Sequence, residues 1–214
     1  MLSTWEAIRQ RRSIRKYTND EVPDDLINQI LEAARLAPSG CNNQPWRFIV
    51  VRDEKVRRGI CQLCSKQRFI EEAPITIVCF ADLNRYSPES MKNQWNELVD
   101  WGIAQTLSGD LAKQEHWEQR PIAQFGREKQ LFMAVSNTFI AIEHILLMAT
   151  ALGLGTCFLG ATDDGKLNKL FSLPNNLASV AVVTVGYPAG QIPAPRPRIT
   201  MKQMLLKPFP VQTQ

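Results

Sequence analysis

The stretches RRSIR at residues 11–15 and APSGCNNQPW at residues 37–46 reveal the most about this chain. The first places three guanidinium groups and a hydroxyl within five residues. Guanidinium groups match phosphate oxygens bidentately and stay charged at any working pH. The second is a turn of small residues and carboxamides before a strand-like segment, and such a turn can bring backbone N–H groups and amide side chains close to a flat polar ring. Together they predict a site for a mononucleotide-like cofactor.

Length and charge predict one ordinary domain with a substantial core. The chain has 214 residues and a formal net charge of +4, and its basic clusters lie at 8–15 and 196–198. This charge distribution argues against a nucleic-acid-binding protein, which would carry a long basic face. The sequence shows no apolar run of transmembrane length and no signal-peptide core at its start, so we expect a soluble, cytoplasmic protein without a membrane partner.

The cysteines and histidines do not indicate a metal centre or a disulfide framework. There are five cysteines, and Cys61 and Cys64 have CxxC spacing without a second pair or a nearby histidine. We therefore expect two thiols packed one helical turn apart. Of the two histidines, His144 is expected to pack within an apolar helix and His116 to be solvated, so neither metal catalysis nor a Ser-His-Asp triad is supported.

Apolar periodicity and turn residues predict alternating helices and strands. The expected helices are 4–10, 23–37, about 53–68, 132–152 and 163–171 (with Thr162 as N-cap), and the expected strands are 46–52, 75–81, 156–159 and 179–186. Residues 132–152 are apolar around most of the circumference, which predicts a central helix buried on several sides. This order favours an α+β or α/β sandwich with a mixed sheet. A partly helical excursion at 84–129 and an extended Pro-rich arm from Pro188, lying across another surface such as a partner subunit, complete the single domain 1–214.

Five blocks, in this order, resemble the FMN-dependent nitroreductases. They are RRSIRKY at 11–17, APSGCNNQPWRFIVV at 37–51, EEAPITIVCFAD at 71–82, ALGLGTCFLG at 151–160, and VGYP at 185–188 followed by Arg196-Pro197-Arg198. Only the stretch from about 83 to 129 has no counterpart. The resemblance implies a nitroreductase-like α+β fold: a mixed central sheet flanked by helices, a long buried central helix, and a domain-swapped homodimer with an FMN in each interface cleft.

The resemblance assigns the FMN phosphate to residues near both ends of the chain. Arg11, Arg12 and Ser13 fall where the family grips the phosphate, and Arg196 and Arg198 fall where a basic-x-basic pair completes the cage. Without the resemblance, the first group would be a solvated basic helix end and the second a pair of ordinary exposed arginines. Two residues apart in an extended segment, Arg196 and Arg198 point the same way.

Arg15 is implied to lie beside the N1–C2 carbonyl edge of the flavin. A fixed cation there raises the reduction potential, because a reduced flavin holds its negative charge at that edge. The family often has an asparagine near residues 66–68 that bonds the pyrimidine edge; none is present, and Gln67 is our substitute. Phe69 stands where a lysine sometimes occurs, so we expect Arg15 to be the only cation at that edge.

The turn at 38–44 is implied to line the flavin ring and ribityl chain from the neighbouring subunit. Its residues of interest are Pro38, Ser39, Gly40, Asn42 and Gln44. Ser39 and Asn42 are expected to touch the cofactor, whereas Gln44 is expected to hold the turn. Taken alone, the same residues would make an ordinary helix-to-strand turn.

The glycines at 153–155 do not form a dinucleotide-binding loop. They follow a helix and precede a strand, and Phe158 occupies the third glycine position of the fingerprint. The resemblance points instead to the backbone N–H groups of Leu159 and Gly160, which would approach flavin O4 and N5; only a glycine-like surface allows that approach.

The activity implied by the resemblance is that of an FMN-dependent NAD(P)H oxidoreductase. A hydride would pass from nicotinamide to flavin, and a nitroaromatic, quinone or related acceptor would then bind in the same slot, in ping-pong order. We expect no general acid or base, since the cofactor carries the chemistry. The segment 84–129 would cover the ring, where tryptophans 95, 101 and 117 either stack on substrate or pack helices.

Three alternatives remain open at this point. A specialised flavoenzyme on the same fold, such as a reductive dehalogenase or a flavin-converting synthase, would differ in what 84–129 places over the ring. A non-catalytic flavin-binding protein would hold FMN without turnover. A helical interaction domain would use its basic ends to bind an acidic partner.

Overall fold

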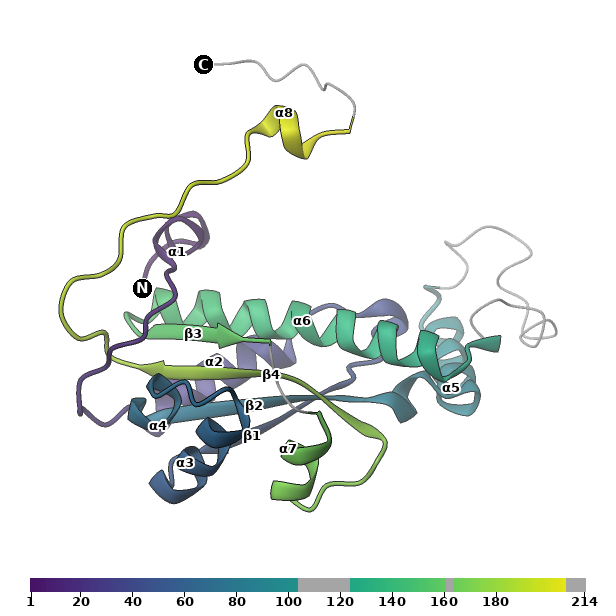
Figure 1. Cartoon of the computed structure of the whole chain (residues 1–214). Helices are drawn as coiled ribbons and strands as arrows, with labels where there is room; N and C mark the ends of the chain where they lie inside the picture. Colours follow the sequence, from purple (N-terminus) through teal and green to yellow (C-terminus); the bar gives the residue numbers. More distant parts are fainter. Residues whose placement is uncertain (104–123, 161–163, 207–214) are drawn as a thin grey trace.

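A four-stranded sheet organises the chain, and the strand order is β1-β2-β4-β3. The computed structural model describes residues 1–103, 124–160 and 164–206 (Figure 1). The strands are β1 (Trp46–Val51), β2 (Ile75–Asp82), β3 (Gly155–Leu159) and β4 (Leu177–Gly186). β2 and β4 lie at the centre, where their side chains are buried on both faces, as their β-branched composition predicts.

Helices cover both faces of this sheet (Figure 1). The α-helices are α1 (Thr4–Gln10), α2 (Asp24–Arg35), α3 (Glu54–Leu63), α4 (Phe69–Glu72), α5 (Pro88–Asp100), α6 (Arg127–Ala151), α7 (Asp164–Leu170) and α8 (Met201–Met204), and the 3-10 helices are η1 (Gly40–Asn42) and η2 (Leu83–Tyr86). On one face, side chains of α2, α5 and α6 form the larger core with alternate residues of β2. On the other, α3, α4 and α7 form a second, smaller core.

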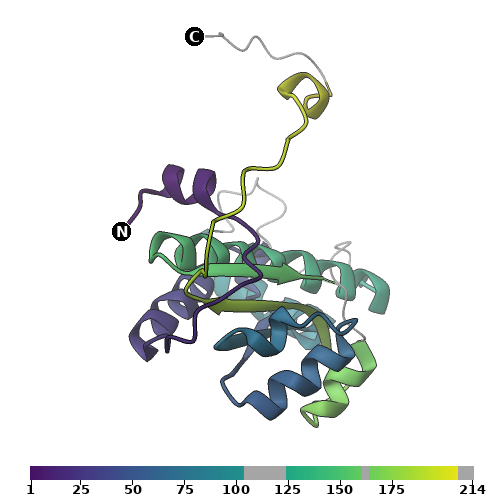
Figure 2. The ribbon, with the colours of Figure 1, turned by 60° about the vertical axis from the view of Figure 1, so that its left-hand side comes forward.

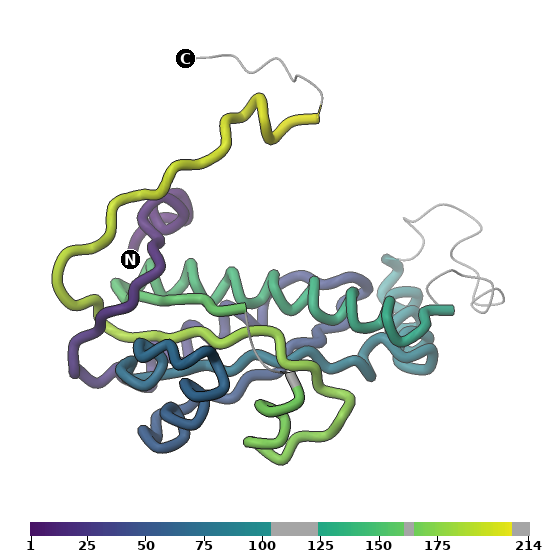
Figure 3. The backbone as a smooth tube through the Cα atoms, viewed as in Figure 1, coloured from purple at the N-terminus to yellow at the C-terminus, as the bar shows by residue number. Residues whose placement is uncertain are grey.

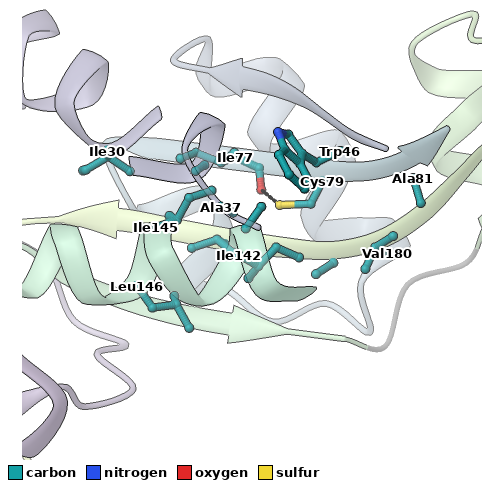
Figure 4. Close-up of a cluster of buried hydrophobic side chains, with 14 of the residues drawn as sticks. Ile30, Ala37, Trp46, Ile77, Cys79, Ala81, Ile142, Ile145, Leu146 and Val180 are labelled. Atoms are coloured by element: carbon teal, nitrogen blue, oxygen red, sulfur yellow. Dashed lines mark hydrogen bonds between the residues drawn. The ribbon is translucent and has the colours of Figure 1, made fainter. Parts of the chain in front are cut away.

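The larger core joins α6 to the sheet and to α2 (Figure 4). Ile77 of β2, Ile142 of α6 and Ile30 of α2 are each at most 1% exposed. Burying each such side chain contributes about 1.5–3 kcal/mol relative to leaving it in water. This core fixes α6 against the sheet and therefore fixes β3, which follows it.

α6 is buried along one face and exposed along another. Ala134, Ala141 and Ile145 are fully buried, whereas Phe132 is 59% and Phe139 40% exposed. The long buried core helix that the composition predicted is therefore present, and one side of it is uncovered in the single chain. By length and composition α6 could cross a membrane, but its buried face packs on α2 and the sheet, as the core helix of a globular fold does.

The sheet is not mixed in the way we predicted. All three pairs of neighbouring strands within the described residues are antiparallel. The reason is the connection from β1 to β2: α3 and α4 return the chain to the end of the sheet that it left, so that Val51 pairs with Thr76. The helix expected at about 53–68 ends earlier, at Leu63, because Ser65 and Lys66 both have left-handed backbone. The predicted N-cap Thr162 lies outside the described residues.

The first and last segments of the chain run side by side (Figure 3). Ser13 forms an isolated parallel bridge to Thr156 of β3, and Tyr17 forms an antiparallel bridge to Pro188. Beyond Pro188 the arm has neither helix nor strand until α8, and it rises away from the sheet and its helices (Figure 2). These pairings bring residues more than 140 positions apart in the sequence into one neighbourhood.

Candidate functional site

One cleft of about 410 Å³ lies between the segment around the end of α1 and the C-terminal arm. Its lining residues are Ile8, Arg9, Arg11, Arg12, Ser13, Arg15, Pro193, Ala194, Pro195, Arg196 and Arg198. We call it the arginine cleft. It contains six arginines and a hydroxyl but no carboxylate among its lining residues. The structure therefore brings together the two basic groups that the sequence predicted to share a phosphate.

The RRSIR segment is held at the edge of the sheet by backbone pairing. The N–H of Ile14 donates to the carbonyl of Thr156 over 2.8 Å, and the Ile14 side chain is buried. Because side chains alternate along an extended chain, Ser13 and Arg15 face the opposite way and are exposed. Gly155 permits this approach, since a Cβ at that position would lie 2.8 Å from Ile14.

Arg12 makes several bonds to backbone carbonyls. Its Nη1 donates to the carbonyls of Arg9 (2.7 Å) and Arg11 (2.8 Å) at the end of α1, and its Nε donates to Pro193 in the arm (3.2 Å). The guanidinium thus satisfies helix-end acceptors and fastens the arm to α1. Sequence reasoning expected Arg12 only to grip phosphate, and these bonds show that it also shapes the cleft.

The positive charge of the arginine cleft has no counter-charge within the described part of the chain. None of its six arginines forms an ion pair with a described carboxylate. Arg198 donates only long bonds, of 3.3 and 3.4 Å, to the carbonyls of Arg196 and Pro197. Crowded like charges repel unless an anion joins them, so the donor set fits a multiply charged anion such as a phosphate monoester.

Arg15 lines the arginine cleft and also lies near α4. Its guanidinium carbon is 5.7 Å from the centre of the Phe69 ring, at the start of α4. Burial raises the pKa of the neighbouring Cys157 thiol, and the charges of Arg15 and Arg11 oppose part of that rise. Gln67, two residues before Phe69, is half-buried, and its N–H bonds to the carbonyl of Cys64. Arg15 therefore lies near Phe69, and the role expected of Gln67 at the flavin edge stays a prediction.

Leu159 and Gly160 lie at the far end of β3 from Thr156. Three residues of strand at about 3.3 Å each separate Thr156 from Leu159 by roughly 10 Å. Leu159 is half-buried and Gly160 exposed, so the backbone at this strand end is accessible. A Cβ on Gly160 would lie 3.2 Å from the ring of Phe158. The space at this strand end is thus tight for a side chain.

The 38–44 turn is held by internal hydrogen bonds. The Oγ of Ser39 accepts from the N–H of Gln44 (2.9 Å), and the Nε2 of Gln44 donates to the carbonyl of Asn42 (3.2 Å). The N–H of Gly40 donates to Asn137 Oδ1 of α6 over 2.9 Å. Gln44 therefore stabilises the turn, which is the role expected of it.

This turn does not line the arginine cleft of its own chain. It follows α2 and leads through Pro38 and Gly40 into β1, and its backbone and side chains contact α5 and α6. Within the described residues, no hydrogen bond joins Ser39 or Asn42 to Arg11, Ser13 or the arm. The sequence prediction that another subunit supplies this turn is compatible with that placement.

One arginine, one histidine and two cysteines complete the comparison between the structure and the sequence predictions. Arg9 lines the arginine cleft and was missed; its place in the last turn of α1, two residues before Arg11, was the available signal. The Nδ1 of His144 lies 2.9 Å from the carbonyl of Ala33, so this histidine is a packed helix residue as expected. Cys61 and Cys64 are buried free thiols, and burial raises the pKa of Cys64 to about 11.

The sequence model of the nitroreductase family matches residues 8–187. This chain belongs to the nitroreductase family. The match runs from the last turn of α1 to the residue before Pro188, so it includes RRSIR, the 38–44 turn and the end of β3. The chain is accordingly a nitroreductase-family oxidoreductase with the α+β fold, a central sheet and a long core helix.

Known relatives agree with this assignment. The chain is 34% identical over 207 residues to an NADH dehydrogenase of Thermus thermophilus, covering 96% of each protein. It is 30% identical to an FMN reductase [NAD(P)H] of Bacillus subtilis, covering 91% of this chain and 69% of that protein. An iodotyrosine deiodinase of Thermotoga neapolitana is 25% identical over 97% of this nitroreductase-family chain and 98% of its own. A solved structure from Exiguobacterium sibiricum in complex with FMN shares the fold, with a TM-score of 0.75 at 21% identity, covering 96% of this chain and 97% of that one.

Proposed function

We propose that the protein is an FMN-dependent NAD(P)H oxidoreductase that passes electrons in ping-pong order to nitroaromatic, quinone or related small acceptors. The observation that carries this proposal is the arginine cleft, with six arginines from both ends of the chain and no described carboxylate to pair with them. The family membership and the FMN-reductase relative support the same cofactor and donor.

The cleft would hold the phosphate of FMN. Arg11, Ser13, Arg196 and Arg198 offer donors there, while Arg12 would hold the arm in place in addition to any bond to the phosphate. Arg15 lies closer to Phe69 and would face the ring, where its charge would raise the reduction potential of the flavin. When bound, FMN would supply the hydride chemistry, so no side chain of this chain is assigned as general acid or base.

The ring and ribityl chain would be held by groups beyond the phosphate. Leu159, Gly160 and Gln67 would come from the same chain, and the 38–44 turn, with Pro38, Ser39, Gly40, Asn42 and Gln44, from a second copy. The segment at 84–129 would act as the lid that sets acceptor choice. Its described part includes α5, in which Trp95 is buried and therefore packs a helix in this chain.

We also propose that the protein is a homodimer of single-domain subunits, 1–214, with exchanged arms. Phe132 and Phe139 of α6 and Trp5 of α1 are 59%, 40% and 65% exposed. Exposed apolar side chains on neighbouring helices favour a protein interface. The arm also projects away from the sheet and its helices (Figure 2), as an arm that lies on a second copy would. A dimer would also bring the 38–44 turn of one copy to the cleft of the other. All five cysteines are free, which supports a reducing, cytoplasmic location.

The test is the visible spectrum of the purified protein. We expect a flavin spectrum, bleaching by NADH or NADPH under anaerobic conditions, and return of the colour when a quinone is added. Initial rates at several fixed quinone concentrations should give parallel double-reciprocal lines. A colourless protein that binds no added FMN would refute the proposal, and bound flavin that neither nicotinamide bleaches would favour a non-catalytic flavin-binding protein.

A second candidate is a reductive dehalogenase on the same fold, and the iodotyrosine deiodinase relative favours it. Both functions would use the same arginine cleft and would differ in what the lid admits. Dithionite-reduced protein mixed with an iodinated tyrosine would release iodide in this case. Reoxidation by quinone without iodide release would leave the reductase as the function.

A further inference from the structure

The turn at 41–44 adopts a backbone conformation that its residues do not favour. Cys41, Asn42 and Gln44 have φ angles of 51°, 54° and 48°. In the left-handed region a Cβ crowds the following carbonyl, and among non-glycine residues asparagine and aspartate tolerate this best, whereas cysteine and glutamine do not. Such a conformation persists only where the surroundings determine it, and it concentrates at ligand sites. Side chains from outside the turn add to its internal hydrogen bonds.

Two side chains from the following segment bind the carbonyls of this turn. The Nε of Arg85, in η2, donates to the carbonyl of Asn43 over 2.6 Å. The amide of Gln94, in α5, is assigned from its neighbours, as amide orientations are. Its nitrogen donates to the carbonyls of Asn42 (3.2 Å) and Cys41 (3.3 Å), and its oxygen accepts from Arg85 Nη2 (2.9 Å). Three successive carbonyls are thus bound by one linked pair, which we call the Arg85–Gln94 clamp.

The clamp sits on a packed base. Gln94 is 7% exposed, and Asn43 is fully buried with its Nδ2 2.9 Å from the sulfur of Met91. Burial raises the pKa of Tyr86 to about 12, and the adjacent Asn43 side chain opposes part of that rise. Arg85 forms no ion pair with a described carboxylate. The polar groups that the structure shows bound to its guanidinium are the Asn43 carbonyl and the Gln94 side chain.

We propose that Arg85 and Gln94 are positioning residues that hold the left-handed turn and so present Ser39 and Asn42 to the flavin ring. This inference rests on the proposed function, because the turn matters for flavin only if a second copy offers it to the cleft. Both residues lie in the first part of 84–129, the segment without a family counterpart, and the proposal assigns that part a role in holding the turn. Removing Arg85 takes away the side-chain donor to the carbonyl of buried Asn43. Removing Gln94 takes away one donor each from the carbonyls of Cys41 and Asn42, and only Gln44 then remains as a side-chain donor to Asn42. The turn then relaxes toward a conformation that its residues prefer.

The experiment measures flavin binding by the full-length apoprotein of Arg85→Met, Gln94→Met and Arg85→Lys. Arg58→Met is the matched control, because Arg58 is exposed and pairs only with Glu54 and Glu71 in the described structure. Fluorescence titrations give the Kd for FMN and for riboflavin. We expect Arg85→Met and Gln94→Met to weaken both flavins by the same factor, about tenfold, since loss of a buried hydrogen bond has that order of effect.

Two further readouts separate positioning from general destabilisation. At saturating FMN, the visible band of the bound flavin should differ from wild type in both methionine variants, because ring contacts change. Arg85→Lys should recover part of the affinity, since an ammonium can donate to Asn43 but cannot also reach Gln94 in the guanidinium geometry. If Arg85→Met does not fold, Gln94→Met, which removes no charge, carries the test.

The inference is overturned if both methionine variants bind FMN and riboflavin as wild type does, with unchanged spectra. It is also overturned if they weaken FMN but not riboflavin, because the clamp would then act on the phosphate end. Wild-type protein that binds neither flavin would refute the proposed function itself and this inference with it. The control variant should match wild type in every case.

Discussion

Replacing Arg196 and Arg198 by alanine should weaken FMN binding and leave riboflavin binding unchanged. Both arginines are exposed and line the arginine cleft opposite the residues that follow α1. The bonds of Arg198 to its own backbone are long, 3.3 and 3.4 Å, so they cost little to exchange for a phosphate. Each lost charge-assisted bond at a solvent-exposed site should weaken binding about tenfold, and the double variant about a hundredfold.

The assay is a fluorescence-quenching titration of apoprotein with FMN and with riboflavin, which lacks the phosphate. Wild type should bind riboflavin poorly, and the double variant should bind it equally poorly. Raising the salt concentration should reduce the FMN difference, because screening weakens exposed charge pairs. Arg58→Ala removes an exposed arginine outside the cleft and is the control. If the double variant loses as much riboflavin affinity as FMN affinity, these arginines support the fold or the ring site and the assignment to phosphate is wrong.

Three further predictions concern the flavin edge, the arm and the buried thiols. Arg15→Ala should retain most FMN but lower the flavin midpoint potential by tens of millivolts, as about 30 mV corresponds to about 1.4 kcal/mol for two electrons; an unchanged potential at full occupancy would place Arg15 away from that edge. Truncation before Pro188 should abolish both dimerisation and flavin binding, and a flavin-replete monomer in sedimentation would contradict this. The pKa of Cys64 is raised to about 11 by burial, so its thiol should resist iodoacetamide at pH 8.5 in folded but not unfolded protein. Rapid labelling of this thiol in the folded protein would contradict the prediction. Because the pKa of Cys64 is raised in the folded state, the stability that the buried thiol contributes is present below the usual thiol pKa and is lost as the pH rises toward 11.

The sequence located the elements well because their signals are local. The helix predicted at 4–10 was found at Thr4–Gln10, where Ser3 and Glu6 form a capping box. The strands expected at 46–52 and 75–81 were found within one residue. The relative direction of the strands was predicted less well. It depends on whether the connection between two strands returns to the same end of the sheet or runs to the opposite end, which makes the strands antiparallel or parallel. Nothing local in residues 53–74 shows that α3 and α4 bring the chain back to the end of the sheet it left.

The sequence predicted which residues line the cleft better than it predicted the hydrogen bonds that these residues make. Family resemblance proposed that RRSIR and Arg196-Pro197-Arg198 share a ligand, and the structure places both in the arginine cleft. The bonds of Arg12 to three carbonyls were not predictable, because they depend on where the arm passes the end of α1. The bonds of Arg85 and Gln94 were not predictable from the sequence either. Both residues lie in the segment that has no counterpart in the family, and they bind a left-handed turn some fifty residues earlier in the chain.

The position of the arginine cleft at a sheet edge has a consequence for how binding and folding are linked. β3 is an edge strand, and the RRSIR segment covers its first residues through the Ser13–Thr156 bridge. The arm is then anchored by the Tyr17–Pro188 bridge and by Arg12, so both walls of the cleft depend on a few contacts outside the two cores. Segments with few buried contacts open at low free-energy cost, whereas the central strands open only with global unfolding. A phosphate joining Arg11 to Arg198 would therefore act chiefly on the two terminal segments, ordering them on a sheet that is already formed.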